Sequence, residues 1–99
     1  MTRKEHLLFI LAEEAAEVAQ RASKAARFGL GEVQPGQNES NARRIIHEYA
    51  DLEAVLEMLR EGHGFDLRGF EDMKKAKKEK VEKFLLYSAE CGTVTPPTL

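Results

Sequence analysis

From Met1 to Phe28 the chain contains neither glycine nor proline, and this uninterrupted segment is the feature that most restricts the fold. Thr2 and Glu5 have the spacing of a capping box, in which two residues satisfy the free N–H groups at the start of a helix. Apolar residues then recur at about 100° per residue, as on an amphipathic helix. Gly29 is suited to end the helix. We therefore expect one long helix up to Phe28.

One side of this expected helix is rich in alanine, so a neighbouring helix can approach it closely. Its members are Leu8, Leu11, Ala12, Ala15, Val18, Ala19, Ala22, Ala25 and Ala26. Glu13, Glu14 and Glu17 lie within one arc of about 100°, roughly opposite the alanine side. Taken alone, such a cluster of glutamates is typical of a solvated polar face.

The rest of the chain predicts two more helices. The segment 29–40 is rich in glycine, proline and asparagine and is expected to form a long loop of the functional kind. Ser40 or Asn41 can cap a second helix that runs to about Glu61. We expect Asp66 to cap a third helix with a Lys-rich polar side.

Three such helices predict an all-α fold, an antiparallel helical bundle whose four-helix-type core is completed by oligomerisation. Ile46, Ala50 and Ala54 give the second helix extra apolar surface that suits a self-interface. We therefore expect a homodimer or a homotetramer built as a dimer of dimers. Residues 1–90 are expected to form a single helical domain, and 91–99, with Pro96 and Pro97, a flexible tail.

Composition excludes several classes of protein. The 99 residues are 42% hydrophobic without any tryptophan, which predicts a globular chain with a thin core that gains from association. The net charge of −2 argues against a nucleic-acid partner. The single cysteine, Cys91, cannot form an internal disulfide, and neither a secretory leader nor a membrane span is evident. A cytoplasmic location without membrane contact is expected.

Glu48 lies inside the apolar stripe of the second helix, between Val55 and Leu52 on the helical wheel, and Asp51 lies at the edge of that stripe. A carboxylate within a packed face is costly unless it is paired, protonated or bound to a metal. A salt bridge or a raised pKa would satisfy Glu48, and so would a metal ion.

The spacing of the acids favours the metal interpretation. Glu14 and Glu17 are three residues apart, as are Glu48 and Asp51, so each pair lies on adjacent turns of one helix face. Two antiparallel helices with such pairs would bring four carboxylates together, and without a cation these would repel each other. Carboxylate oxygens are the hard ligands that Mg²⁺ prefers.

The two acidic motifs also resemble a known family. Glu14-Ala-Ala-Glu17, followed after a loop by Glu48-Tyr-Ala-Asp51, is similar to the ExxE…ExxD signature of the MazG-like all-α nucleoside triphosphate pyrophosphohydrolases. The resemblance implies that these four acids bind Mg²⁺, with Mn²⁺ as a possible substitute. It also implies that Glu13 orients a ligand or the attacking water, and that a nucleoside triphosphate is cleaved to the monophosphate and pyrophosphate.

Such an enzyme needs cations or polar groups that contact the substrate. The candidates are Lys24, Arg27, Asn41, Arg44, Lys80 and Lys83. Other interpretations stay open for most of them. The lysines and Arg27 also suit ordinary solubilising charge, and Asn41 also suits a helix cap.

The loop before the second helix bears on the choice of nucleotide. Residues 28–38 and 41–44 resemble loops of small phage-type MazG-like enzymes, some of which hydrolyse dGTP or GTP. This favours (d)GTP, and in that case a host cytoplasm, with dCTP or dUTP as the pyrimidine alternative. A non-enzymatic helical adaptor or oligomerisation module is the main rival. A di-iron bundle is disfavoured because no Glu-x-x-His motif occurs.

Overall fold

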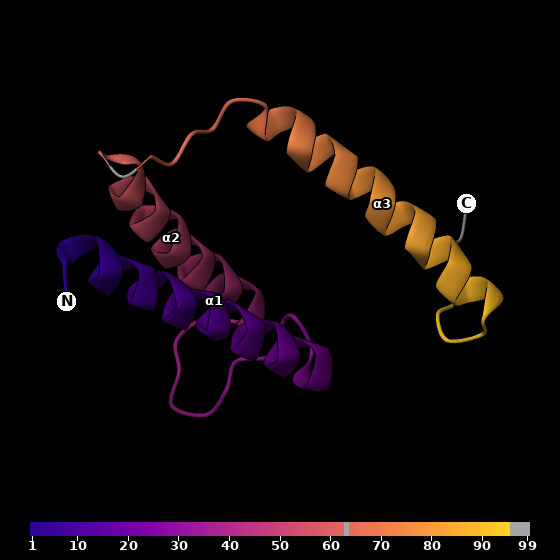
Figure 1. Ribbon diagram of the computed structural model, residues 1–99. Coiled ribbons are helices and arrows are strands. Elements are labelled where there is room, and N and C mark those ends of the chain that lie inside the picture. Colours follow the sequence, from indigo (N-terminus) through magenta and orange to yellow (C-terminus); the bar gives the residue numbers. More distant parts are fainter. Residues whose placement is uncertain (63, 96–99) are drawn as a thin grey trace. The chain divides into compact units, whose positions relative to one another are not determined.

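The computed structural model describes residues 1–62 and 64–95, and in these residues it contains three α-helices and no strand. The helices are α1 (Arg3–Phe28), α2 (Asn41–Arg60) and α3 (Phe70–Glu90) (Figure 1). The all-α prediction is therefore confirmed. The chain divides into two compact units, the first being Met1–Asp66 and the second beginning at Leu67. The expected single domain over residues 1–90 stays a prediction.

Local sequence accounts for both ends of α1. The Thr2 hydroxyl accepts a hydrogen bond from the Glu5 N–H at 3.1 Å, and the Glu5 carboxylate accepts one from the Thr2 N–H at 3.3 Å. This reciprocal pair is the predicted capping box. At the other end Gly29 adopts a φ of 103°, a backbone conformation that favours glycine. The predicted bounds of α1 are confirmed.

The loop between α1 and α2 is tied to the first turn of α2. Ser40 caps α2 by accepting a hydrogen bond from the Arg43 N–H at 3.2 Å. The Asn41 N–H donates to the Glu32 carbonyl, and the Ala42 N–H donates to the Leu30 carbonyl, both at 2.9 Å. The first N–H groups of a helix have no acceptor within the helix itself. Here they donate to loop carbonyls and thereby hold the loop against the start of α2.

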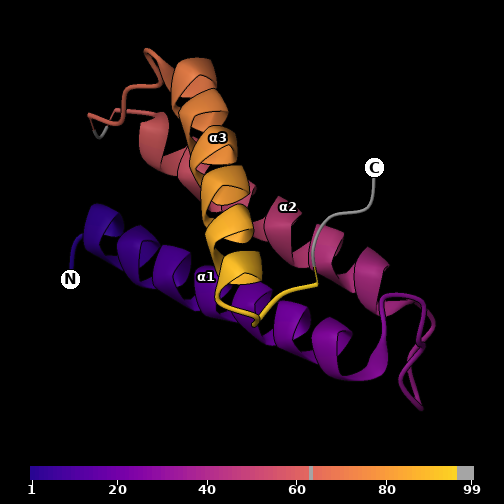
Figure 2. The ribbon, with the colours of Figure 1, turned by 90° about the vertical axis from the view of Figure 1, so that its right-hand side faces the viewer.

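The first unit is a helical hairpin in which α1 and α2 run antiparallel and side by side (Figures 1 and 2). Its small core consists of Leu7 and Ala25 from α1 and Leu59 from α2. Leu7 and Ala25 lie at opposite ends of one stripe of α1 that also carries Leu11 and Val18, both half-buried. The members of this stripe share one side of α1 because they recur at helical spacing, and their burial indicates that this side faces α2.

Only one edge of the alanine side of α1 packs on α2, the edge with Leu11, Val18 and Ala25. Ala12, Ala15, Ala19 and Ala22 are all exposed, whereas Glu14 is half-buried. Glu14 was expected roughly opposite the alanine side, but it shares the packed stripe with Leu7 and Val18. The apolar surface of α1 is wide, and α2 covers only the edge next to Glu14.

The third helix begins later than predicted. Asp66 does not cap it, since α3 begins at Phe70 after Gly69, whose φ is 77°. Glycine tolerates this left-handed conformation, which delays the helix by one turn. After α3 the Thr93 N–H bonds the Ser88 carbonyl at 3.0 Å, so the first part of the expected tail is a turn. Pro96 and Pro97 lie outside the described residues.

Apolar side chains of α3 are exposed along its length. Met73, Val81, Phe84 and Leu86 keep more than two-fifths of their surface accessible, and none of the residues of α3 is buried. In the described part of the chain, none of the helices has the length and apolarity that crossing a bilayer requires.

Candidate metal centre and adjacent pocket

Three carboxylates from the two helices of the hairpin converge. Glu14 of α1 and Glu48 and Asp51 of α2 each offer an oxygen atom, and these atoms all lie within 4.8 Å of one another. We call this cluster the acidic triad. Glu14 and Glu48 are half-buried and Asp51 is exposed, as the wheel predicted for the two residues of α2. The antiparallel packing of the hairpin thus brings together three of the four predicted ligands.

The triad concentrates negative charge. Burial raises the pKa of Glu14 above its ordinary value of 4.5, and the carboxylates of Asp51, Glu48, Glu17 and Glu13 raise it further, in that order. Among the described residues, no lysine, arginine or histidine forms an ion pair with any member of the triad. The ionised form of Glu14 therefore lacks a positive partner in the part of the chain that the structure describes.

The two other predicted acids lie beside the triad. Glu17 is exposed on the next turn of α1 and is not among the carboxylates that meet within 4.8 Å. Glu13 is exposed as well. Both are close enough to contribute to the raised pKa of Glu14. Their roles as ligand and as catalytic residue stay predictions.

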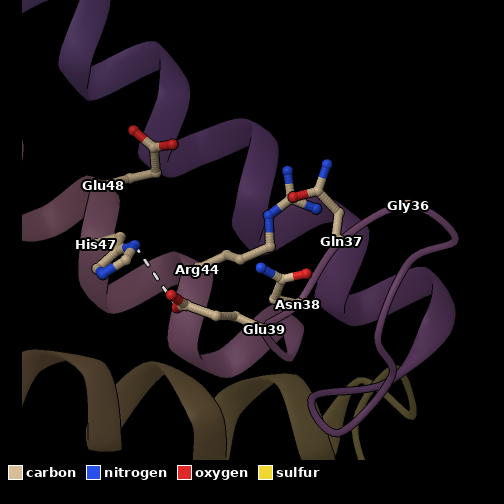
Figure 3. Close-up of a pocket in the computed structure, with 7 residues that line it drawn as sticks. All are labelled: Gly36, Gln37, Asn38, Glu39, Arg44, His47 and Glu48. Carbon is tan, nitrogen blue, oxygen red and sulfur yellow. Dashed lines mark ion pairs between the residues drawn. The ribbon is translucent and has the colours of Figure 1, made fainter.

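A pocket of about 200 Å³ adjoins the triad. Residues 36–39 of the loop form one wall, and Arg44, His47 and Glu48 of α2 form the other (Figure 3). In Figure 3 the side chains of Arg44 and Glu48 both extend from α2 towards α1. Because Glu48 belongs to the pocket and to the triad, a molecule in the pocket would be next to the clustered carboxylates.

The pocket carries both signs of charge. Arg44 is half-buried and donates from Nη1 to the Gln34 side-chain oxygen at 3.0 Å. The Nδ1 atom of His47 lies 3.6 Å from a carboxylate oxygen of Glu39, and the Arg43 Nε atom lies 3.9 Å from the same oxygen. Glu39 is thus held between two side chains of α2, which positions the loop wall of the pocket.

The remaining predicted contacts differ in their surroundings. Asn41 is 1% exposed, and its side-chain amide donates to the Gly29 carbonyl at 2.8 Å and to the Glu32 carboxylate at 2.9 Å. Its alternative interpretation as a structural residue at the helix start therefore has direct support. Lys24 is half-buried, and the Arg27 guanidinium lies 4.8 Å from the centre of the Phe28 ring.

Lys80 and Lys83 are exposed on α3, in the second unit. Lys80 lines a shallow groove of that helix together with Val81 and Phe84. Substrate contact by these lysines stays a prediction, as it does for Lys24, Arg27, Asn41 and Arg44.

Three polar residues of the hairpin are not among the candidates named from the sequence: His47, Glu39 and Arg21. His47 is exposed, as a surface histidine is, and it also lines the pocket. His47 comes directly before Glu48, so its place beside a candidate ligand is a signal that was available. Arg21 lies seven residues after Glu14, on the same side of α1, and is only 9% exposed.

The geometry offers a cluster of hard oxygen ligands beside a polar pocket with an arginine in its wall. Such an arrangement suits a divalent cation and an anionic molecule bound next to each other. Comparison of the chain with protein-family models, with curated proteins and with solved structures found no match. The likeness of the two acidic motifs to the MazG-like family stays a prediction that rests on those motifs.

Proposed function

We propose that this chain is a divalent-metal-dependent nucleoside triphosphate pyrophosphohydrolase, which cleaves its substrate to the nucleoside monophosphate and pyrophosphate. The observation that supports this most is the meeting of Glu14, Glu48 and Asp51 within 4.8 Å, with no basic side chain of the described residues paired to them. The family resemblance of the two motifs supports the same function.

The donor set fits Mg²⁺, with Mn²⁺ as a substitute. All three atoms are carboxylate oxygens, and Glu17, three residues after Glu14 on α1, would add a fourth. Cations that prefer nitrogen or sulfur ligands are poorly matched, because no histidine or cysteine belongs to the cluster among the described residues. Glu14, Glu17, Glu48 and Asp51 would therefore hold the ion.

A divalent ion held there supplies a bound water of lowered pKa and a partner for phosphate oxygens. The chain itself positions the reactants. Arg44 faces the pocket next to Glu48 and suits a phosphate or the nucleoside. Glu13, which is close enough to influence Glu14, would orient the attacking water. The water oxygen forms a bond to the α-phosphorus as the bond from that phosphorus to the bridging oxygen breaks; pyrophosphate leaves with the electron pair, and the proton of the water passes to solvent.

The pocket formed by residues 36–39 and α2 is the proposed place of the nucleoside. Its volume of about 200 Å³ and its polar wall suit a base with hydrogen-bonding edges better than an apolar group. The likeness of the loop to those of phage-type enzymes favours (d)GTP. The pyrimidine nucleotides dCTP and dUTP are the alternative that a substrate panel separates.

We further propose that the active form is a homodimer or homotetramer, in which two copies complete a four-helix-type core. Several large apolar side chains are each at least two-fifths exposed: Leu8 and Phe9 of α1, Ile46 of α2, and Met73, Val81, Phe84 and Leu86 of α3. A chain whose hairpin buries so few apolar side chains gains stability when a second copy covers such surface.

A helical adaptor is the second candidate, favoured by the same exposed apolar side chains of α3. An adaptor accounts for those side chains but gives no reason for Glu14 and Glu48 to occupy the packed faces of both helices. The two functions therefore differ in one property, the dependence on a divalent cation.

The test is a panel of ribo- and deoxyribonucleoside triphosphates with Mg²⁺ or Mn²⁺, in which pyrophosphate release is measured. Wild type is expected to hydrolyse at least one of them, and Glu48→Gln to be nearly inactive. Glu53→Gln is the matched control, since Glu53 is exposed on the same helix outside the triad. A wild type inert towards every nucleotide, or a Glu48→Gln variant as active as wild type, would overturn the proposal.

A further inference from the structure

Arg21 is a buried charge without a partner. Only 9% of its surface is exposed, and its Nε and Nη1 atoms are buried with no hydrogen-bond acceptor among the described residues. A guanidinium in such a place is costly unless an anion or several acceptors compensate it. None of the described residues supplies such a group to these two atoms, so the site has room for a bound anion.

The position of Arg21 relates it to the acidic triad. It follows Glu14 by seven residues on the same side of α1, a rise of about 10 Å along the helix axis. Side chains on a helix lean towards its N-terminus, so the long Arg21 side chain covers part of that distance in the direction of Glu14. It therefore approaches the triad along the packed side of α1.

The opposite helix places a second arginine at the same level. The hairpin is antiparallel, with Glu14 beside Asp51, and Arg44 precedes Asp51 by seven residues just as Arg21 follows Glu14. Two arginines, one from each helix, thus lie on the loop side of the triad. The pocket that Arg44 lines extends on this side as well.

Arg21 lies two helical turns from Glu14 on the same side of α1, and the two side chains do not neutralise each other. No ion pair in the described part of the chain involves Arg21. An anion that is bridged to the carboxylates through a divalent cation would lie between the two and satisfy both.

We propose that Arg21 binds a phosphate group of the substrate's polyphosphate chain and of the pyrophosphate product. This inference rests on the proposed function, because it places the ligand at the same site. The planar guanidinium donates two parallel N–H groups, which matches two oxygens of one phosphate. Arg21 acts here as a binding residue, additional to the cations predicted from the sequence.

The test measures the binding of inorganic pyrophosphate to the full-length protein by titration calorimetry at a fixed Mg²⁺ concentration. Arg21→Met keeps much of the apolar stem and removes the charge, and Arg21→Lys keeps the charge without the paired donors. Arg3→Met is the control, because Arg3 is exposed in the first turn of the same helix. Circular dichroism checks that each variant stays helical.

We expect Arg21→Met to weaken pyrophosphate binding about tenfold or more, the usual effect of losing a hydrogen bond to a charged group. Arg21→Lys should fall between Arg21→Met and wild type, and Arg3→Met should bind as wild type does. Without pyrophosphate, Arg21→Met should unfold at the same temperature as wild type or higher, because an uncompensated buried charge has been removed. An arginine satisfied by buried water or by Glu17 would instead leave the variant less stable.

The inference is overturned if Arg21→Met binds pyrophosphate as tightly as wild type, or if wild type shows no binding. Its failure is separable from that of the proposed function. Pyrophosphate binding that depends on Arg21, in a protein that hydrolyses no nucleotide, supports the anion site and refutes the enzyme. Hydrolysis by wild type with an unchanged KM and kcat in Arg21→Met supports the enzyme and refutes the role of Arg21.

Discussion

Asn41 provides the sharpest test of how the long loop is held. Its buried amide donates one hydrogen bond to the Gly29 carbonyl at 2.8 Å and one to the Glu32 carboxylate at 2.9 Å. Both acceptors lie in the loop, while Asn41 itself is the first residue of α2. The amide therefore joins the end of α1, the loop and the start of α2.

These two hydrogen bonds set the loss of stability that we expect for Asn41→Ala. A hydrogen bond to a neutral acceptor contributes about 1 kcal/mol, and one to a charged acceptor contributes about 1.5–3 kcal/mol. Glu32 is half-buried, so its bond belongs near the lower value. Asn41→Ala should therefore lower the free energy of unfolding by roughly 2–3 kcal/mol. With an m-value near 1 kcal/mol/M, the urea midpoint falls by about 2–3 M.

The substitution Asn41→Asp is more discriminating, because it keeps the shape of the side chain and replaces the donor by an acceptor. At pH 7 a carboxylate would face the Gly29 carbonyl and the Glu32 carboxylate, so we expect a larger loss than for Asn41→Ala. The loss should shrink as the pH falls towards about 4 and the new acid is protonated.

The assay is urea unfolding followed by circular dichroism, with all proteins at one concentration because association would shift the midpoints. Asn38→Asp is the control, since Asn38 is exposed in the same loop. If Asn41→Asp is as stable as wild type at pH 7, the amide is not the donor in this network and the account of the loop is wrong.

Three further outcomes follow from the hairpin. In the presence of EDTA, wild type should gain stability as the pH falls from 7 towards 4.5, because the raised pKa of Glu14 makes the folded state bind a proton more readily. In thermal unfolding, Glu14→Gln should not gain stability as the pH falls. The same dependence of stability on pH in wild type and Glu14→Gln would contradict this prediction. Leu59 is 0% exposed, so Leu59→Ala should lower the free energy of unfolding in urea by about 2–5 kcal/mol. Leu30 is 61% exposed, so Leu30→Ala should lower it little. Similar losses for the two variants would be inconsistent with this core. Ser40→Ala removes the cap of α2 and should cost about 1 kcal/mol by the same measurement, and an unchanged midpoint would show that the hydroxyl does not stabilise the helix.

The ends of α1 and the start of α2 could be predicted because they depend on neighbours in sequence. Thr2 and Glu5 meet across one helical turn, and Ser40 caps the N–H group three residues later. Asp66 misled for a reason of the same local kind. It resembles a cap, but Gly69 adopts a left-handed conformation and delays the helix to Phe70.

The partner of each helix face could not be predicted in the same way. The apolar surface of α1 is wide, and periodicity does not tell which part of it meets α2 and which part stays exposed. This choice decides the place of Glu14, which is half-buried like Val18, while Ala19 is exposed. Spacing predicted a pair of acids on each helix, but only the packing of the two helices determines that three of the four carboxylates meet.

Charged side chains lie on the packed sides of the hairpin, and their positions bear on function as well as on structure. Glu14, Arg21 and Glu48 occupy the packed sides of α1 and α2, where leucine or valine would contribute more to stability. Proteins commonly keep a polar residue that lowers their stability at a position where binding or catalysis needs it. The two signs lie at different levels of the hairpin and form no ion pair in the described part of the chain, so mutual compensation does not explain them. The proposed ligand, a metal-bound polyphosphate, would supply a cation to the acids and an anion to the arginine, and a single ligand would thereby account for all three residues.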